Sequence, residues 1–290
     1  MNIKEFYLSN LKKLQIIPII MLLLSMAILF NSYFATSQFL EKDISLKGGS
    51  TITITTSKDT LNIEGFLRGK FDAEFSTRKL AEFGTSIQKG IVIETSMNEI
   101  DKLKPALEEF FGMKLTKDNF SVEVTEASLG KAFSSQIIRA TIAAFILMAI
   151  VVFITFRVIV PSIAVIFAAA FDIIISMAGM NLLGIKLSIP TAAALLLLIG
   201  YSVDTDILLT TRILKRKAFG SLDDRIIESI KTGSTMTFAS LAALLVGYIA
   251  TNSFVMKSMF LVIIIGLVAD LFSTWLVNVY ILKTYAEKHG

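Results

Sequence analysis

Six long, predominantly apolar runs constrain this chain more than any other feature of its sequence. They lie at about 16–35, 140–156, 162–183, 189–211, 235–250 and 259–282. A bilayer demands about 20 apolar residues from a spanning helix, and these runs approach that length. The chain is 54% hydrophobic and only 18% charged, which excludes a soluble globule and a disordered chain. We therefore expect six transmembrane helices.

Basic residues set the expected orientation of the six spans. With the N-terminus inside, twelve Lys and Arg residues fall on the cytoplasmic side and only Lys186 and Lys257 fall in the short outer loops. This asymmetry follows the positive-inside rule and places both termini in the cytoplasm. The expected location is the cell membrane, in a multi-pass arrangement. A cleaved signal peptide over the first span stays an alternative, since Ala35 and Ser37 are small residues.

The insert between the first two spans, residues 37–133, is expected to be an extracytoplasmic domain. It carries 13 basic and 15 acidic residues, so it is nearly neutral, and it alternates strand-like and helix-like patterns. The expected elements are strands at 50–57, 73–81, 87–95 and 119–125 and helices at 61–70 and 98–111. The order βαββαβ is typical of a ferredoxin-like α+β fold. The remaining domains are 1–36, with the first helix, and 134–290, with helices two to six and a cytoplasmic loop at 212–234.

Four aspartates inside the spans are the candidate functional residues: Asp172, Asp204, Asp206 and Asp270. An aspartate at the centre of a membrane helix costs about 2.5–3.5 kcal/mol on insertion scales, so the four must be protonated, paired or hydrated. We interpret them as an ion or proton relay, with Asp172 and Asp204 at its centre and Asp206 and Asp270 secondary. Asp204 and Asp206 point about 200° apart on a helix, so both cannot line one cavity. Structural hydrogen bonds to neighbouring Ser and Thr residues are the alternative.

Other kinds of site find no support in the residues. Cysteine is absent and the single histidine is His289, which argues against disulfides, a Ser-His-Asp triad and a histidine-built zinc site. No basic groove with interleaved aromatic residues is present, so we expect no nucleic-acid binding. We expect no enzyme activity, no cofactor and no metal.

Several motifs resemble the SecD and SecF family of protein-export membrane subunits. Lys47, Gly48 and Gly49 after the first span resemble the family's Gly-Gly motif, and Phe171-Asp172 resembles its His-Asp element. The fourth-span signature is matched by Gly200, Tyr201, Ser202, Asp204 and Arg212. Gly130 falls where the family has a glycine-rich re-entry.

The insert size and the single six-span unit favour the SecF branch over SecD, and departures from the bacterial pattern suggest an archaeal type. Bacterial relatives have Asn-Asp where this chain has Asp204-Thr205, and they carry an arginine at the start of the fifth span where residues 231–234 hold none. Asp270 has no acidic counterpart in the bacterial pattern. These differences put direct transfer of the bacterial proton path in doubt.

The resemblance implies a function in protein export. The implied partners are a SecD-like subunit, the Sec translocon and the exported polypeptide, and the resemblance implies that an ion gradient, expected to be one of protons, drives movement of the outer domain. Three alternatives remain. They are half of an RND-type small-molecule or lipid exporter, an intramembrane aspartic protease with Asp172 and Asp204 as its dyad, and a purely structural subunit of the Sec machinery.

Overall fold

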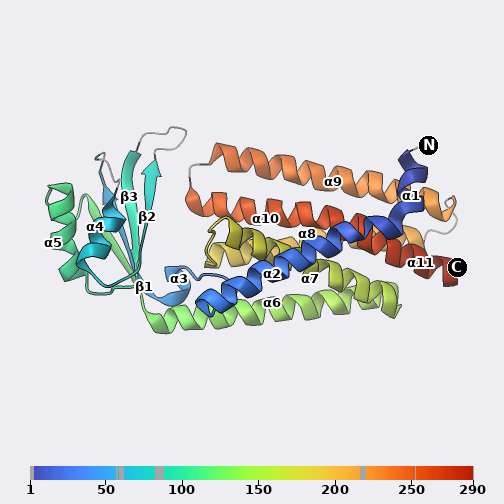
Figure 1. The fold of residues 1–290 in the computed structure, drawn as a ribbon, viewed down its shortest axis with the longest axis horizontal. Coiled ribbons are helices and arrows are strands. Elements are labelled where there is room, and N and C mark those ends of the chain that lie inside the picture. The colour runs from blue at the N-terminus through green and yellow to red at the C-terminus, as the bar shows by residue number, and fades with distance from the viewer. Residues whose placement is uncertain are drawn as a thin grey trace.

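A computed structural model describes residues 3–56, 58, 62–81, 88–215, 220–251 and 253–289. The described part is elongated, with a small sheet at one end and long helices running away from it along the long axis (Figure 1). Both described ends of the chain lie at the end far from the sheet (Figure 1). Some residues used in the sequence-based expectations lie outside the described ranges. They are the expected strand and helix ends at Ser57, Leu61 and Ile87 and the basic residues Arg216 and Lys217.

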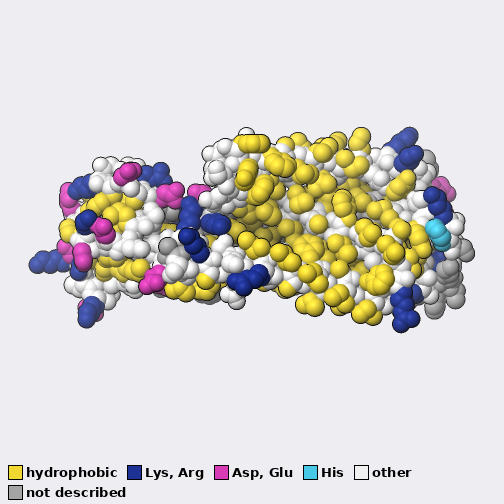
Figure 2. All heavy atoms as spheres, turned by 90° about the horizontal axis from the view of Figure 1, so that it is seen from below, with side chains coloured by type: hydrophobic (Ala, Val, Ile, Leu, Met, Phe, Trp, Pro, Cys, Tyr) yellow, Lys and Arg dark blue, Asp and Glu magenta, His cyan; other side chains and the backbone are white. Residues whose placement is uncertain are grey.

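Six segments of the described chain are long and apolar enough to cross a membrane, as the sequence predicted. Their helices are α1 (Ile3–Leu14) with α2 (Ile16–Thr36), α6 (Ala127–Phe156), α7 (Ile159–Leu182), α8 (Ile189–Leu214), α9 (Leu222–Ala250), and the run of α10 (Phe254–Phe272), η1 (Ser273–Asn278) and α11 (Val279–His289). On the face seen in Figure 2, hydrophobic side chains cover most of this helix bundle, and basic side chains gather toward its two ends. This distribution is that of a multi-pass membrane protein.

Two helices extend beyond the apolar runs that predicted them. Helix α9 begins at Leu222 and α8 continues to Leu214, so the expected loop over 212–234 is mostly helical. The Ser221 hydroxyl accepts a hydrogen bond from the Asp224 backbone N–H, and acidic residues occupy the first turn, which stabilises this polar start. Hydropathy detects only the part of a helix that lies in lipid, and it therefore missed these polar turns.

The sheet end contains four antiparallel strands and two longer helices. The strands are β1 (Gly49–Thr55), β2 (Phe75–Ala81), β3 (Gln88–Thr95) and β4 (Phe120–Thr125), in the sheet order β2-β3-β1-β4. Helices α4 (Ile63–Lys70) and α5 (Ile100–Phe111) pack on one face, where Ile52 and Ile54 of β1 meet Leu103 and Leu107 of α5 in an apolar core. We call β1–β4 with α4 and α5 the sheet domain.

The opposite face of the sheet, which α4 and α5 do not cover, faces the helix bundle. Thr51, Thr53 and Arg78 from this face line a cavity of about 780 Å³ together with residues from the starts of α8 and α10. The Arg78 guanidinium pairs with Glu94 and lies 4.8 Å from the ring centroid of Phe254 in the first turn of α10. A cation–π contact therefore joins the sheet domain to the bundle.

A tight backbone contact fixes the connection between the sheet domain and the bundle. The short helix α3 (Ile44–Lys47) ends at Gly48, whose φ of 86° lies in the left-handed region that favours glycine. A Cβ atom on Gly130 of α6 would lie only 2.9 Å from the backbone N of Gly48 and 2.9 Å from the carbonyl O of Leu46. Because β4 is followed by α6 after only Glu126, α6 is a direct mechanical extension of the sheet domain.

The centre of the bundle consists of α7, α8 and α10, which are about half buried, whereas α6 and α9 expose most of their surface. Close approach of α8 and α10 depends on Gly266, where an added Cβ would lie 2.1 Å from the Leu198 side chain. Gly233 of α9 lies in the same way under the ring of Trp275. These small residues let neighbouring helices approach closely inside the bundle.

Candidate functional site

Eight polar side chains meet in the buried centre of the bundle, and we call them the polar cluster. They are Asp172 from α7, Ser202, Thr205 and Asp206 from α8, Asp270 from α10, and Ser273, Thr274 and Asn278 from η1. All eight side chains are buried, and the three carboxylates have no solvent exposure. Such residues in a membrane bundle are rare and mark ion or proton pathways.

Asp172 is held from two neighbouring helices. The Ser202 hydroxyl donates to Oδ2 of Asp172 at 2.5 Å, and the Ser273 hydroxyl donates to Oδ1 at 2.8 Å. Both donors are neutral, and none of the ion pairs found among the described residues involves Asp172. Asp172 therefore sits at the junction of α7, α8 and η1, bonded to hydroxyl groups rather than to a cation.

A single hydroxyl group links the other two carboxylates. The Thr274 Oγ1 lies 3.0 Å from Oδ1 of Asp206 and 2.9 Å from Oδ1 of Asp270. A threonine hydroxyl carries one hydrogen, so it can donate to only one of the two carboxylates at a time and accept from the other if that one is protonated. Thr205 Oγ1 lies 3.1 Å from Oδ2 of Asp270 and 2.8 Å from the carbonyl O of Ser202, which extends the chain of contacts toward Asp172.

A local change of helix type supplies three of these donors. Residues Ser273–Asn278 form a π-helix, in which the Val279 backbone N–H bonds to the carbonyl of Thr274, five residues earlier. π-helical turns inside α-helices are uncommon and occur frequently at functional sites. The turn places Thr274 and Asn278 against Asp206, and the Asn278 amide donates to Oδ1 of Asp206 at 2.6 Å.

Three oxygens near Asp206 have no hydrogen-bond partner among the described residues. They are Oδ2 of Asp206, Oγ1 of Thr210 one turn further along α8, and Oδ1 of Asn278. A free carboxylate oxygen can take up a proton or a bridging water without losing an existing bond. No group of three or more acidic or histidine side chains in the described chain has the geometry to hold a metal ion.

The structure separates Asp204 from the other three aspartates. Asp204 is exposed on the outside of α8, whereas Asp206, two residues later, points into the polar cluster. The expected approach of Asp172 to Asp204 is therefore wrong, and it is Asp206 and Asp270, expected to be secondary, that lie with Asp172 in the polar cluster. The 200° separation of Asp204 and Asp206 was correct, but which of them faces inward depends on the neighbouring helices. An aspartic dyad of Asp172 and Asp204, which the protease alternative needs, is not formed.

Three members of the polar cluster were not predicted from the sequence: Ser273, Thr274 and Asn278. A signal for them exists, because they follow Asp270 at spacings of three, four and eight residues inside an otherwise apolar run. Those spacings place polar side chains on the face of the helix that carries Asp270. Among the neighbouring Ser and Thr residues, which were expected to bond the aspartates, Ser202 and Thr205 do donate hydrogen bonds to them. Ser176 is buried without a partner among the described residues.

Comparison with known proteins places the chain in a family. The family model "Protein export membrane protein SecD/SecF, C-terminal" matches residues 105–288. The protein-export membrane protein SecF of Pyrococcus furiosus is 38% identical over 285 residues, which covers 96% of this chain and 92% of that protein. SecF of Methanocaldococcus jannaschii is 37% identical and covers 94% of this chain and 95% of that protein. The chain belongs to the SecF family.

Solved structures of SecDF share the fold of this SecF-family chain. The crystal structure of SecDF from Thermus thermophilus matches with a TM-score of 0.76 at 19% identity, covering 99% of this chain and 40% of that one. A SecDF structure in a super-membrane-facing form matches with a TM-score of 0.59 at 18% identity, covering 98% of this chain and 39% of that one. This chain thus spans about two-fifths of the SecDF chains.

The residues of the family motifs fall into two groups in this SecF-family chain. Lys47, Gly48 and Gly49 lie at the joint with the sheet domain, where Lys47 forms an ion pair with Glu74 at 3.0 Å and a Cβ on Gly49 would lie 2.3 Å from the carbonyl O of Thr95. In the fourth-span motif, Ser202 alone enters the polar cluster. The other members of that motif, Gly200, Tyr201 and Asp204, lie on the open side of α8, while Arg212 is half-buried near its end.

Proposed function

We propose that this chain supports protein export as the SecF-like member of a SecD–SecF pair, and that a proton relay through Asp172, Asp206 and Asp270 drives movement of the sheet domain. The observation that carries the proposal is the Thr274 hydroxyl within hydrogen-bond distance of both Asp206 and Asp270. Such a bridge passes a proton from one carboxyl to the other by exchanging which oxygen donates.

Charge balance supports a relay over a purely structural cluster. Three buried carboxylates without a paired Lys or Arg in the described chain are too costly to hold in ionised form, so protons must neutralise part of the charge. Loss or gain of a proton changes which hydroxyl bonds which carboxylate, and this favours different packings of α8 against α10 and η1. Moving one charge through 100 mV supplies about 2.3 kcal/mol, enough to shift such an equilibrium by more than tenfold.

The proposed route from the polar cluster to the sheet domain runs through α6. This helix packs against α7 and α8, and after a single residue it is continuous with β4. At 30 residues it is about 45 Å long. A shift of α7 or α8 would thus tilt α6 and carry the sheet domain with it.

We place the sheet domain outside the cell and assign it a ferredoxin-like fold. The element order β1-α4-β2-β3-α5-β4 and the sheet order β2-β3-β1-β4 support the fold. The twelve-to-two excess of basic residues on the opposite side of the bundle supports the placement, with both termini in the cytoplasm.

A SecD-like partner is the proposed neighbour of the open side of α8. Asp204 is an exposed carboxylate inside a membrane-spanning helix, and nothing lies within 4 Å of where a Cβ on Gly200 would stand. A carboxylate facing lipid is expensive, so this side is best explained as covered by a second membrane chain that donates hydrogen bonds or a cation.

The test compares two neutral substitutions on one helix. Asp206→Asn and Asp204→Asn remove the same charge two residues apart, but only the first changes the polar cluster. The variants are expressed in cells that lack their own copy of this protein. We expect Asp206→Asn to abolish export there, while the protein still accumulates and co-purifies with its SecD-like partner. We expect Asp204→Asn to weaken co-purification of the partner. Export at the wild-type rate with Asp206→Asn would show that the relay is wrong.

A further inference from the structure

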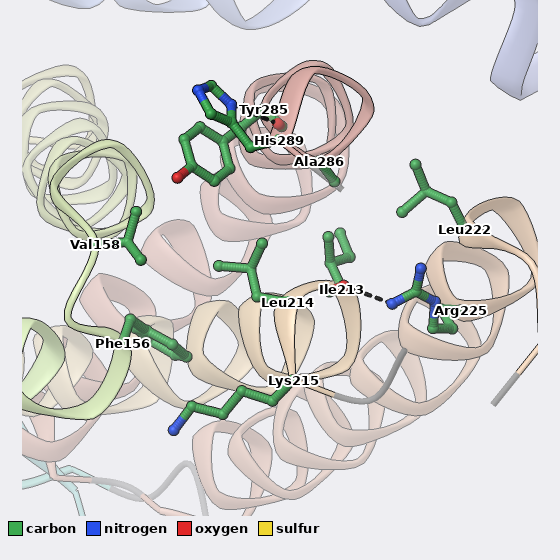
Figure 3. A pocket seen from close by; sticks show the side chains of 10 residues that line it. All are labelled: Phe156, Val158, Ile213, Leu214, Lys215, Leu222, Arg225, Tyr285, Ala286 and His289. Carbon is green, nitrogen blue, oxygen red and sulfur yellow. Dashed lines mark hydrogen bonds between the residues drawn. The ribbon is translucent and has the colours of Figure 1, made fainter. Parts of the chain in front are cut away.

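A second cavity lies at the end of the bundle far from the sheet domain, where α6, α8 and α11 end and α9 begins. Its volume is about 440 Å³, within the range of small-ligand sites. Figure 3 shows the side chains of Phe156, Leu214 and Tyr285 arranged around it. None of the eight residues of the polar cluster lines it, and no step of the proposed export cycle uses it.

The ionisable side chains that line this cavity are mainly basic. Its lining includes three basic side chains, Lys215, Arg225 and His289, and no acidic residue among those described. The Lys215 ammonium lies 5.6 Å from the ring centroid of Phe156, and the His289 ring stacks on Tyr285 with a centroid separation of 4.4 Å. Neither Lys215 nor Arg225 takes part in an ion pair found among the described residues.

Arg225 is held in place by the backbone. Its Nη1 donates to the carbonyl O of Ile213 at 2.6 Å, at the C-terminal end of α8, as the dashed line in Figure 3 marks. Its Nε is buried without a hydrogen-bond partner among the described residues. An arginine anchored in this way keeps its positive charge at the cavity, because the C-terminal end of the α8 dipole is equivalent to only about half an elementary negative charge.

We infer that this cavity binds the phosphate headgroup of an anionic membrane phospholipid, with Lys215 and Arg225 facing the phosphate and Phe156 and Leu214 contacting the first methylenes of the lipid. Two observations select a lipid over a soluble anion. The cavity lies at the ends of membrane-spanning helices, where headgroups are concentrated, and its wall is apolar between the basic groups. Basic pockets between membrane helices bind anionic headgroups, and each Lys or Arg near an anionic membrane surface contributes about 1 kcal/mol of attraction.

The experiment measures lipid binding by the full-length chain in dodecyl maltoside micelles. Native mass spectrometry gives dissociation constants for phosphatidylglycerol, phosphatidylcholine and glycerol 3-phosphate. We expect phosphatidylglycerol to bind at least fivefold more tightly than phosphatidylcholine. We expect Lys215→Gln to weaken phosphatidylglycerol about fivefold, the factor that corresponds to 1 kcal/mol, and to leave phosphatidylcholine unchanged.

The control is Lys231→Gln, which removes one positive charge from an exposed position on α9 outside the cavity. Lys215 is also exposed, so neither substitution threatens the fold. Arg225→Gln is less suitable because Arg225 also binds the end of α8. Equal binding of the two lipids, or an equal loss with Lys231→Gln, would overturn the inference. Binding of glycerol 3-phosphate as tight as that of phosphatidylglycerol would also overturn it, because the site would then be one for soluble phosphate esters.

Discussion

Asn278 donates its side-chain amide to the carboxylate of Asp206 at 2.6 Å, from the π-helical turn of the last span to α8. Both side chains are buried, at 1% and 0% exposure. A hydrogen bond to a carboxylate in such a place contributes more than one between neutral groups, because neither partner has water as a substitute. This contact also fixes which face of the last span meets α8.

The first prediction concerns this contact. We expect Asn278→Ala to destabilise the protein by about 1.5–3 kcal/mol, since it leaves Asp206 with one donor fewer in a buried site. Export should fall in parallel. Unfolding in detergent micelles measures the stability, and Asn181→Ala is the control because the Asn181 amide makes only a 3.3 Å bond at the surface. An equal effect of the two substitutions would contradict the assigned role of Asn278.

The second prediction concerns the joint between α3 and α6. Alanine in place of a helical glycine gains about 1 kcal/mol from helix propensity. We expect Gly65→Ala in α4 to show this gain, because nothing lies within 4 Å of its added Cβ. Gly130→Ala should be destabilising instead, since its Cβ would lie 2.9 Å from two backbone atoms that cannot move as a side chain does. Stabilisation by Gly130→Ala would show that the contact between α3 and α6 is loose.

The third prediction concerns pH. The Lys47 ammonium, hydrogen-bonded to Glu74, lowers the pKa of that carboxyl below its ordinary value. A carboxyl with a lowered pKa in the folded state stabilises the protein at neutral pH, and this contribution is lost as the pH falls below the range where glutamate titrates, about pH 4. Glu74 is largely exposed, so the contribution is small, about 0.2–1 kcal/mol.

Thermal unfolding at two pH values tests this. Glu74→Gln should lower the unfolding midpoint at pH 7 and have no effect at pH 3, and Lys47→Gln should behave in the same way. High salt should reduce the difference at pH 7, because the pair is near the surface. A difference that persists at pH 3 would assign the effect of the substitution to something other than this ion pair.

The fourth prediction concerns orientation in the membrane. The chain has no cysteine, so single cysteines can report on their own position. We expect Lys117→Cys, exposed in the sheet domain, to react with an impermeant maleimide on intact cells. Lys231→Cys, exposed near the start of α9, should react only after lysis. The reverse pattern would invert the proposed topology and remove the sheet domain from the outer surface.

The helices and strands of this protein could be predicted from local patterns in the amino-acid sequence. Six apolar runs predicted the six long helices, because the cost of exposing backbone groups to lipid leaves few other structures for a run of about 20 apolar residues. Alternation of β-branched and polar residues predicted strands where the structure has β1 and β4. The intramembrane aspartates were also visible, since a charged residue inside an apolar run stands out without any knowledge of the fold.

Which aspartates meet depends on how the helices pack. The sequence of α8 does not tell whether Asp204 or Asp206 faces the centre of the bundle. The packing of α7 and α10 against α8 determines this. These helices contribute Asp172, 34 residues before Asp206, and Asp270, 64 residues after it. The π-helical turn that brings Thr274 and Asn278 to Asp206 has no sequence pattern of its own. The contact of Gly130 with Gly48 likewise joins positions 82 residues apart. Sequence patterns predict helices and strands because these form from interactions between residues close together in the chain. The packing of helices depends on contacts between residues that are distant in the chain.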